Sequence, residues 1–273
     1  MSHKYGPDIN VLSFGAGVQS TTIALMIKHG EIPPVVAGVF ADTQSEPDYV
    51  YKWLEQIKDL ITFPIITSTA GNLATDVVKL VTGEKNRIDT PPFNGRVSDK
   101  LSSSYSVQLT RACTGYYKLR VIRRVVKRLK ARYNAHRVNQ YIGISTDEAH
   151  RIKSSDVWYV KNQFPLIDLD MSRDDCIAWL SNHNYPVPKK SSCWMCPYKS
   201  YDGWKELKSV EPHTFKKACE LDEMLRPMKI PRIEKDFYIW SSLKPLSMLF
   251  PAQNIDENSR DGFGNECEGL CGV

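Results

Sequence analysis

Residues 9–29 read INVLSFGAGVQSTTIALMIKH, in which an apolar run is followed by a glycine-containing turn and then by a helical pattern. The segment Ile9–Phe14 predicts a buried strand, and Ser20–His29 predicts a helix that stops at Gly30. Glycines let the backbone turn sharply at this junction and approach a ligand closely. The N–H groups at the start of the helix then favour an anion, most naturally a phosphate.

The alternation of strands and helices continues to residue 81. Val35–Phe40 and Pro64–Thr67 predict two more strands, and helical patterns follow at about 45–57 and 72–81. This β-α-β-α-β-α order predicts an α/β fold with a doubly wound parallel sheet. Right-handed crossovers between parallel strands place the ligand at the carboxyl ends of the strands.

The chain becomes polar from Gly83 to Tyr105, which predicts a long mobile loop of the kind that covers an active site. A long helix is predicted from 116 to 133, and later strands at 141–144 and 160–167. Ser172 is a suitable N-cap for a helix that runs to about Trp179.

Beyond Pro186 the strand–helix alternation ends, and cysteines, prolines and short helical patterns take over. We therefore expect two units. Residues 1–186 are predicted to form a nucleotide-binding domain, and residues 187–273 a small, cysteine-rich, mostly helical C-terminal subdomain.

The composition excludes several classes of protein. The chain of 273 residues is 42% hydrophobic and 10% aromatic, which is too apolar for a mainly disordered chain. No apolar run approaches the roughly 20 residues that span a bilayer, and the N-terminus carries no apolar signal segment. We expect a cytoplasmic protein without a membrane partner. In a reducing compartment its seven cysteines are expected to be ligands, nucleophiles or buried thiols rather than disulfides.

The glycine-containing turn has three interpretations. A phosphate site is favoured by its density of small and hydroxyl residues, and the alternative is a plain turn with a serine cap. The pattern Gly15-x-Gly17-x-x-Ser20 also differs from the dinucleotide fingerprint at one residue, because Ser20 stands where the third Gly belongs. Asp42 ends the second strand, where a ribose-binding acid would lie. A nicotinamide or flavin enzyme is therefore a rival. The lysine of the Walker loop is absent, which excludes an ordinary P-loop NTPase.

Five segments, in order, resemble the PP-loop ATP-pyrophosphatase superfamily and, within it, the phosphoadenosine phosphosulfate reductase family. They are Ser13–Thr21, Phe40–Thr43 followed by Glu46, Arg111–Thr114 with Tyr117–Lys118, Gly143–Arg151, and Pro165–Asp168. The resemblance implies an adenine nucleotide in the site. Its contacts are then expected from Ser13, Phe14, Gly15, Gly17, Gln19, Ser20, Thr21, Asp42, Thr43 and Gly143, with Asp42 and Thr43 facing the ribose or base.

Two acids follow the predicted strand at 141–144, on the ligand face of the sheet. Asp147 or Glu148 can hold a magnesium ion that bridges phosphates, and Arg151 can neutralise transferred charge. The alternative is an ordinary helix N-terminus whose acids favour the dipole. Gln19 stands where PP-loops often carry Asp. A magnesium ion that this Asp would bind must therefore take its ligands from other residues. The six histidines show no paired metal spacing.

Residues 192–197 read SCWMCP and contain a Cys-x-x-Cys turn, whose two thiolates can hold one metal centre. Further ligands are needed, and the candidates are Cys113 and the tail cysteines Cys267 and Cys271. The family resemblance implies that Cys113, Cys193, Cys196 and either Cys267 or Cys271 hold a [4Fe-4S] cluster. A structural zinc site is the alternative, and redox exchange between Cys193 and Cys196 is a third interpretation.

The tail cysteine that is not a ligand is a candidate nucleophile. Sulfonucleotide reductases carry a nucleophilic cysteine in a Glu-Cys-Gly-Leu-type tail, and residues 266–271, ECEGLC, resemble it loosely. The paired cysteines of the cluster-bearing reductases are missing, because Thr114 follows Cys113, and this weighs against simple sulfonucleotide reduction. Cys176 and Cys219 lie within helical patterns and are interpreted as buried apolar thiols.

The helix predicted at 116–133 is strongly basic. Between 118 and 132 it carries eight Lys or Arg residues and no acid, while Val121 and Leu129 belong to its apolar face. The ordinary interpretation is a solvated face. The alternative is a surface for polyanions: the phosphates of the nucleotide, or the backbone of tRNA or DNA. Lys118 lies at the start of this helix, where it can reach a phosphate.

We therefore expect a PP-loop enzyme that uses ATP with magnesium to adenylate an acceptor and release pyrophosphate. Lys118 and Arg151 would stabilise the charge on the phosphates, and a sulfur nucleophile, cluster-bound or on Cys267 or Cys271, would displace AMP. The alternatives are reduction of adenylyl sulfate or its 3′-phosphorylated form to sulfite with a thiol reductant, and a nucleic-acid-binding module without catalysis. A nicotinamide oxidoreductase leaves the cysteines unexplained.

Overall fold

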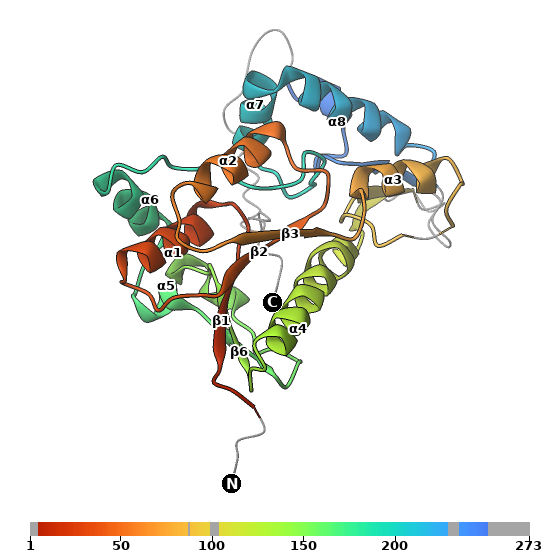
Figure 1. Cartoon of the computed structure of the whole chain (residues 1–273). Helices are drawn as coiled ribbons and strands as arrows, with labels where there is room; N and C mark the ends of the chain where they lie inside the picture. The colour runs from red at the N-terminus through yellow and green to blue at the C-terminus, as the bar shows by residue number, and fades with distance from the viewer. Residues whose placement is uncertain (1–4, 87, 99–103, 229–234, 251–273) are drawn as a thin grey trace.

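A computed structural model describes residues 5–86, 88–98, 104–228 and 235–250. Its centre is a five-stranded sheet in which every pairing is parallel, in the order β3-β2-β1-β6-β7 (Figure 1). The strands are β1 (Ile9–Ser13), β2 (Ala37–Asp42), β3 (Ile65–Thr69), β6 (Val138–Ile142) and β7 (Val160–Gln163). The predicted α/β class with a parallel sheet is confirmed.

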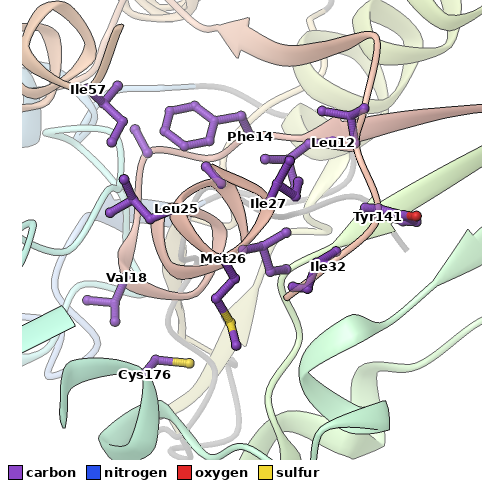
Figure 2. Close-up of a cluster of buried hydrophobic side chains, with 14 of the residues drawn as sticks. Leu12, Phe14, Val18, Leu25, Met26, Ile27, Ile32, Ile57, Tyr141 and Cys176 are labelled. Atoms are coloured by element: carbon purple, nitrogen blue, oxygen red, sulfur yellow. The ribbon is translucent and has the colours of Figure 1, made fainter. Parts of the chain in front are cut away.

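Helices cover both faces of this sheet. On one face, α1 (Val18–His29) packs with α2 (Asp48–Lys58), α5 (Pro165–Asp168) and α6 (Arg173–Asn182) around a shared apolar core. Figure 2 shows part of this core, with Leu25 and Met26 of α1 among side chains of the sheet and Cys176 of α6. On the other face lies α4 (Arg120–Arg132), whose apolar residues pack on β1 and β2. This two-sided covering makes the sheet doubly wound.

Local sequence signals set the ends of these helices. Gly30 ends α1 in the left-handed conformation, with a φ of 78°, which only glycine adopts without cost. Pro47 precedes α2, and Asn72 caps α3 (Leu73–Val81) by accepting a hydrogen bond from the N–H of Thr75. Ser172 and Asp175 form a reciprocal capping box at the start of α6. These boundaries agree with the sequence prediction.

The strand order creates a switch point beside β1. The chain leaves β1 for β2 on one side, and β6 later pairs with β1 on the other side, with Ser13 opposite Ile142. Loops that leave two such strands in opposite directions open a crevice at their carboxyl ends. The turn after Ser13 and the segment after Ile142 therefore meet.

A second body lies at the carboxyl end of the sheet, towards the top right of Figure 1. It contains α3, α7 (Tyr201–Val210), α8 (Pro212–Met224) and a three-stranded antiparallel sheet of β4 (Asn94–Ser98), β5 (Ser104–Gln108) and β8 (Lys235–Tyr238). Its apolar core includes Phe93 and Trp204, so it draws on residues from both sides of position 186.

The prediction of a loop from Gly83 to Tyr105 is wrong in part, because β4 and the start of β5 lie within it. The polar composition hid these strands because each is short, and β4 pairs both with the adjacent β5 and with β8, which lies far along the chain. The predicted strand at 160–167 is also shorter, since Pro165 begins α5. Among the described residues, no helix combines the length and apolar character that a membrane span requires.

Candidate active site

The turn between β1 and α1 is buried and closed by its own hydrogen bonds. Ala16 has a φ of 61°, an unusual value for a residue with a side chain. The Ser20 hydroxyl accepts from the Gly15 N–H at 3.3 Å and donates to the Gly17 carbonyl at 3.2 Å. The Thr21 hydroxyl accepts from Trp53 Nε1 at 3.2 Å. Both predicted phosphate-binding hydroxyls therefore also shape the turn.

Gln19 joins this turn to the segment that follows β6. Its side-chain amide donates to Ser145 at 3.4 Å and to Glu148 at 3.3 Å, and its carbonyl accepts from Arg173 at 3.3 Å. The side chain is 1% exposed. Gln19 thus links three elements at the switch point, in the position where the resembling loops often carry Asp.

The two predicted magnesium ligands lie beside Gln19, on the short helix η2 (Thr146–Arg151). Asp147 accepts from the Arg173 N–H at 3.0 Å, and Glu148 pairs with Arg151. Burial would raise the pKa of Asp147, but hydrogen bonds led by that of Ser145 lower it below its usual value. The structure therefore brings Asp147, Glu148 and Arg151 to the carboxyl edge of the sheet. Each of the two acids there interacts with another residue of this chain.

The other predicted nucleotide contacts described here lie in two places, the turn after β2 and the segment after β6. Asp42 accepts from the Tyr51 hydroxyl at 2.9 Å and from the Gln44 N–H at 2.7 Å, so its carboxylate fixes the turn after β2. The Thr43 hydroxyl donates to Glu46 at 3.2 Å and lies 3.2 Å from the sulfur of Cys193. Gly143 is buried just after β6.

Three of the predicted ligand cysteines converge on one small pocket of about 20 Å³. Cys113, Cys193 and Cys196 line it together with Lys118. Cys267 and Cys271 lie outside the described residues, so the choice between them stays a prediction. Cys176 is fully buried in the α1 core as predicted, whereas Cys219 is only partly buried.

A π-helix brings Cys113 and Lys118 to the same pocket. The segment η1 (Thr114–Leu119) is π-helical, begins directly after Cys113 and runs into α4. In an α-helix, residues five apart point in directions that differ by about 140°. The i→i+5 pattern of a π-helix instead stacks them on one side, and such turns are common at functional sites.

Buried charges surround the thiols. Lys118 Nζ lies 3.6 Å from Glu46 Oε1, and Cys193 lies 3.6 Å from the same oxygen. Burial alone would lower the pKa of Lys118, but the nearby carboxylate of Glu46 raises it above its usual value, so Lys118 is positively charged. Glu46 Oε2 has no hydrogen-bond partner among the described residues. Lys199 is also buried, which lowers its pKa, and donates to Ser192 at 2.6 Å.

The thiols themselves suit a bound metal group. Burial raises the pKa of Cys113 to about 11 and that of Cys193 well above its usual value, so both stay protonated unless a cation binds. Thiolates on one zinc ion, at about 2.3 Å each, lie only about 3.8 Å apart. Within the described chain, Cys113, Cys193 and Cys196 do not form a group whose sulfurs all lie within 4.8 Å of one another. The choice between a zinc ion and an iron–sulfur cluster at these cysteines stays a prediction.

The segment 191–196 ties the thiol pocket to the turn after β1. The Ser191 hydroxyl donates to the Gly15 carbonyl at 2.5 Å, and the Trp194 N–H donates to the Ser45 carbonyl at 2.9 Å. The segment therefore crosses the carboxyl ends of β1 and β2, and Cys193 lies two residues beyond Ser191. An anion on the turn and a metal group on the cysteines would be neighbours.

Sequence reasoning missed four residues of this arrangement as site residues: Glu46, Arg173, Ser191 and Lys199. Glu46 stands within a segment quoted for the family resemblance, but no role was predicted for it. Lys199 closely follows the Cys-x-x-Cys turn, and this position is the feature of the sequence that could have indicated Lys199 as a site residue. Arg173 and Ser191 carry no local signal, because their partners, Gln19 of α1 and Gly15 of the turn before it, lie far away in the sequence.

The basic helix has a buried apolar face, as predicted, and a mixed outer face. Val121, Val125 and Leu129 are buried. Arg124 donates to the Thr69 carbonyl at 2.8 Å, and Arg123 pairs with Asp156. Part of the predicted polyanion surface is therefore used for internal contacts. Lys127, Arg128 and Arg132 are exposed.

No protein-family model matches the chain, and no curated protein matches its sequence. Among solved structures, a phosphoadenylyl-sulfate (PAPS) reductase from Candida auris, in a phosphate complex, is similar over 68% of this chain and 81% of that one, with 15% identity and a TM-score of 0.41. The U34-tRNA thiolase NcsA from Methanococcus maripaludis, with its [4Fe-4S] cluster, is similar over 84% of this chain and 76% of that one, with 14% identity and a TM-score of 0.35. A PAPS reductase is thus among the solved structures to which this chain is similar.

Proposed function

We propose that this chain is a PP-loop enzyme that binds ATP, adenylates an acceptor and transfers sulfur to it. The observation that carries the proposal is the segment 191–196, which joins the turn after β1 to the three-cysteine pocket. A nucleotide site and a thiol site that share one short segment suit a reaction in which activation and sulfur attack follow each other on the same acceptor.

In the first step, a carbonyl oxygen of the acceptor attacks the α-phosphorus of ATP. An oxygen–phosphorus bond forms, the bond to the β-phosphate oxygen breaks, and pyrophosphate leaves. N–H groups of the turn from Gly15 to Thr21 hold the phosphates, and Asp147 or Glu148 would hold a magnesium ion, which would supply positive charge beside them. Lys118, fixed as a cation, and Arg151 stabilise the negative charge that develops on the phosphate oxygens.

In the second step, sulfur at the sulfide level attacks the activated carbon. A carbon–sulfur bond forms, the carbon–oxygen bond breaks, and AMP leaves with the oxygen, so no oxidant or reductant is consumed. Cys113, Cys193, Cys196 and one tail cysteine, Cys267 or Cys271, are proposed to hold a [4Fe-4S] cluster. When bound, this cluster would supply the place from which sulfur is delivered. The remaining tail cysteine is the alternative carrier.

The acceptor is proposed to be a nucleic-acid base or a small carbonyl metabolite. The exposed cations of α4, Lys127, Arg128 and Arg132, support a polyanionic partner such as tRNA or DNA. Arg120, Arg123 and Arg124 are exposed as well, although Arg123 and Arg124 also bind internal groups.

A product assay tests the activity. The purified chain is incubated anaerobically with ATP, magnesium and sulfide, and with tRNA, DNA or a carbonyl metabolite in turn. AMP and pyrophosphate in equal amounts, together with sulfur in the acceptor, are expected for one of them. Neither product with any acceptor contradicts the proposal, and sulfite from adenylyl sulfate or its 3′-phosphorylated form would establish the reductase alternative.

A metal analysis tests the cluster separately. Protein purified without oxygen is expected to be brown and to contain iron and acid-labile sulfide. Cys113→Ser, Cys193→Ser and Cys196→Ser are each expected to lose most of the iron, whereas Cys176→Ser is the matched control, because Cys176 lies in the α1 core. Zinc alone in the wild-type protein would exclude the cluster.

A further inference from the structure

Three metal-ligating side chains converge outside the candidate active site, where α1 and α6 end. His29 is the last residue of α1, Glu31 follows the glycine cap, and His183 is the C-cap of α6. One ligand atom of each lies within 4.8 Å of those of the other two. All three residues are exposed, so an ion can reach them from solvent. The histidines are far apart in sequence, which is why spacing predicted no metal site.

The hydrogen bonds of His183 leave a ring nitrogen available for a metal. Nδ1 lies 2.8 Å from the Trp179 carbonyl oxygen, which can only accept, so Nδ1 carries the proton and Nε2 keeps its lone pair. The ring also stacks on Trp179, with centroids 4.0 Å apart. A histidine that donates one N–H to a backbone carbonyl is the usual arrangement of a metal ligand.

His29 and Glu31 are oriented in the same way. His29 Nε2 lies 3.0 Å from the Tyr185 hydroxyl, and in the tautomer that donates this N–H the lone pair is on Nδ1. Glu31 Oε2 accepts from Trp179 Nε1 at 3.2 Å, which fixes the carboxylate while its other oxygen keeps acceptor capacity. Trp179 and Tyr185 thus position all three candidate ligands.

The separation of the imidazoles agrees with one shared ion. Two imidazoles bound to a tetrahedral Zn²⁺ at about 2.0 Å have ring centroids about 5.2 Å apart. The His29 and His183 centroids are 5.1 Å apart, with an interplanar angle of 65°. The rings therefore already stand at the distance that metal binding requires.

We propose that His29, Glu31 and His183 form a binding site for a divalent transition-metal ion, with Zn²⁺ as the expected ion and water in the remaining position. Two imidazoles and one carboxylate are a common zinc ligand set, and the same donors accept Ni²⁺ or Cu²⁺. The ion would join the ends of α1 and α6. The opposite ends of these helices carry Gln19 and Arg173, which are hydrogen-bonded to each other.

One neighbouring charge opposes the ion and offers a test. Lys28 Nζ donates to the Tyr185 hydroxyl at 3.2 Å and lies 5.4 Å from the centre of that ring. A cation close to a metal site weakens metal binding through repulsion. Lys28→Gln is therefore expected to tighten Zn²⁺ binding, a result that no loss of folding can imitate.

The experiment counts Zn²⁺ bound to the full chain by calorimetry and by metal analysis after gel filtration. His29→Ala, Glu31→Gln and His183→Phe are compared with the wild type, and the exposed His136→Ala is the matched control. His183→Phe keeps a ring against Trp179, and each variant's melting temperature shows that it is folded. Each of the three variants is expected to bind one ion fewer, or to bind it at least tenfold more weakly, while His136→Ala matches the wild type.

A Co²⁺ titration separates this site from the cysteines, because thiolate ligands give intense near-ultraviolet absorption and imidazole ligands do not. The ion lost in His183→Phe is expected to lack that absorption. Equal ion counts in the wild type and all three variants would overturn the proposal, as would an unchanged affinity in Lys28→Gln. The cluster would then be an aromatic contact between two helices.

Discussion

Lys118 Nζ lies 3.6 Å from Glu46 Oε1, and the two side chains are 7% and 1% exposed. The pair joins the π-helix after Cys113 to the turn after β2, and Cys193 lies against the same carboxylate. Two buried charges are tolerated because each neutralises the other. The pair therefore holds together the two walls of the thiol pocket.

Removing one partner of this pair is expected to cost far more than removing both. Lys118→Met leaves Glu46 buried without its ion-pair partner, which costs about 3–5 kcal/mol of unfolding free energy. The double variant Glu46→Gln/Lys118→Met is expected to be more stable than Lys118→Met alone. Urea unfolding measures both, and the exposed pair Lys58–Glu55 is the control, where Lys58→Met costs about 0–1 kcal/mol. Additive losses at positions 46 and 118 would show that the charges are not coupled.

The backbone of Ala16 gives a prediction about nucleotide binding. Its φ of 61° is open to glycine but strongly disfavours a β-branched residue. Ala16→Gly is expected to keep ATP affinity within about twofold, since the strain removed is of order 1 kcal/mol. Ala16→Val is expected to lose ATP binding at least tenfold while the protein remains folded by circular dichroism. Equal binding of ATP by both variants would place the nucleotide away from this turn.

The hydrogen bond from Ser191 to Gly15 is predicted to support the turn. Ser191→Ala removes a buried bond worth about 1 kcal/mol and leaves the Gly15 carbonyl without that donor, so ATP affinity is expected to fall about fivefold. Iron content is expected to be unchanged, because no cysteine is altered. Ser181→Ala is the matched control, since Ser181 is exposed and bonds only within α6 among the contacts described here. If Ser191→Ala and Ser181→Ala bind ATP equally, the bond does not reach the nucleotide.

Asp76 provides a prediction about pH. Burial would raise its pKa, but hydrogen bonds from Lys85 and Tyr117 outweigh this and lower it below the usual value of 3.8. The carboxylate therefore contributes stability above pH 3.8, where it is ionised in both states, and this contribution is lost as pH falls through the lower folded-state pKa. Asp76→Asn is expected to be less stable than the wild type at pH 7. The difference between their unfolding free energies is expected to become smaller towards pH 3. Urea unfolding at both values checks this, and a gap that widens in acid would contradict it.

Much of the main sheet and its helices could be predicted because their signals are local. The apolar run before Gly15 predicts β1, and Ser172 predicts the start of α6 through its own side chain. The strands β4 and β8 could not be predicted in the same way. Each is short, and the two pair with each other although they lie far apart in the chain, so the residues near Asn94 contain no sign of that pairing.

The same distinction applies to the candidate site: residues with a local sequence pattern could be predicted, and residues that depend on distant partners could not. The cysteines and the glycine turn have recognisable spacing, and the structure brings Cys113 to the Cys-x-x-Cys turn as expected. The role of Glu46 could not be predicted, because it depends on Lys118 arriving from another element. The position of Cys113 relative to Lys118 also required a helix type that propensities do not distinguish, since the same residues are equally suited to an α-helix.

The wide turn after Cys113 accommodates one residue more than an ordinary helix would place between Cys113 and Lys118. Loss of one residue between Cys113 and Lys118 would let the backbone relax into an ordinary helix continuous with α4. Such a protein would fold, and its basic helix would still pack against the sheet. Lys118 would then follow Cys113 by four residues, and side chains four apart lie on the same face of an α-helix, so the ammonium group and the sulfur would still share a wall of the pocket.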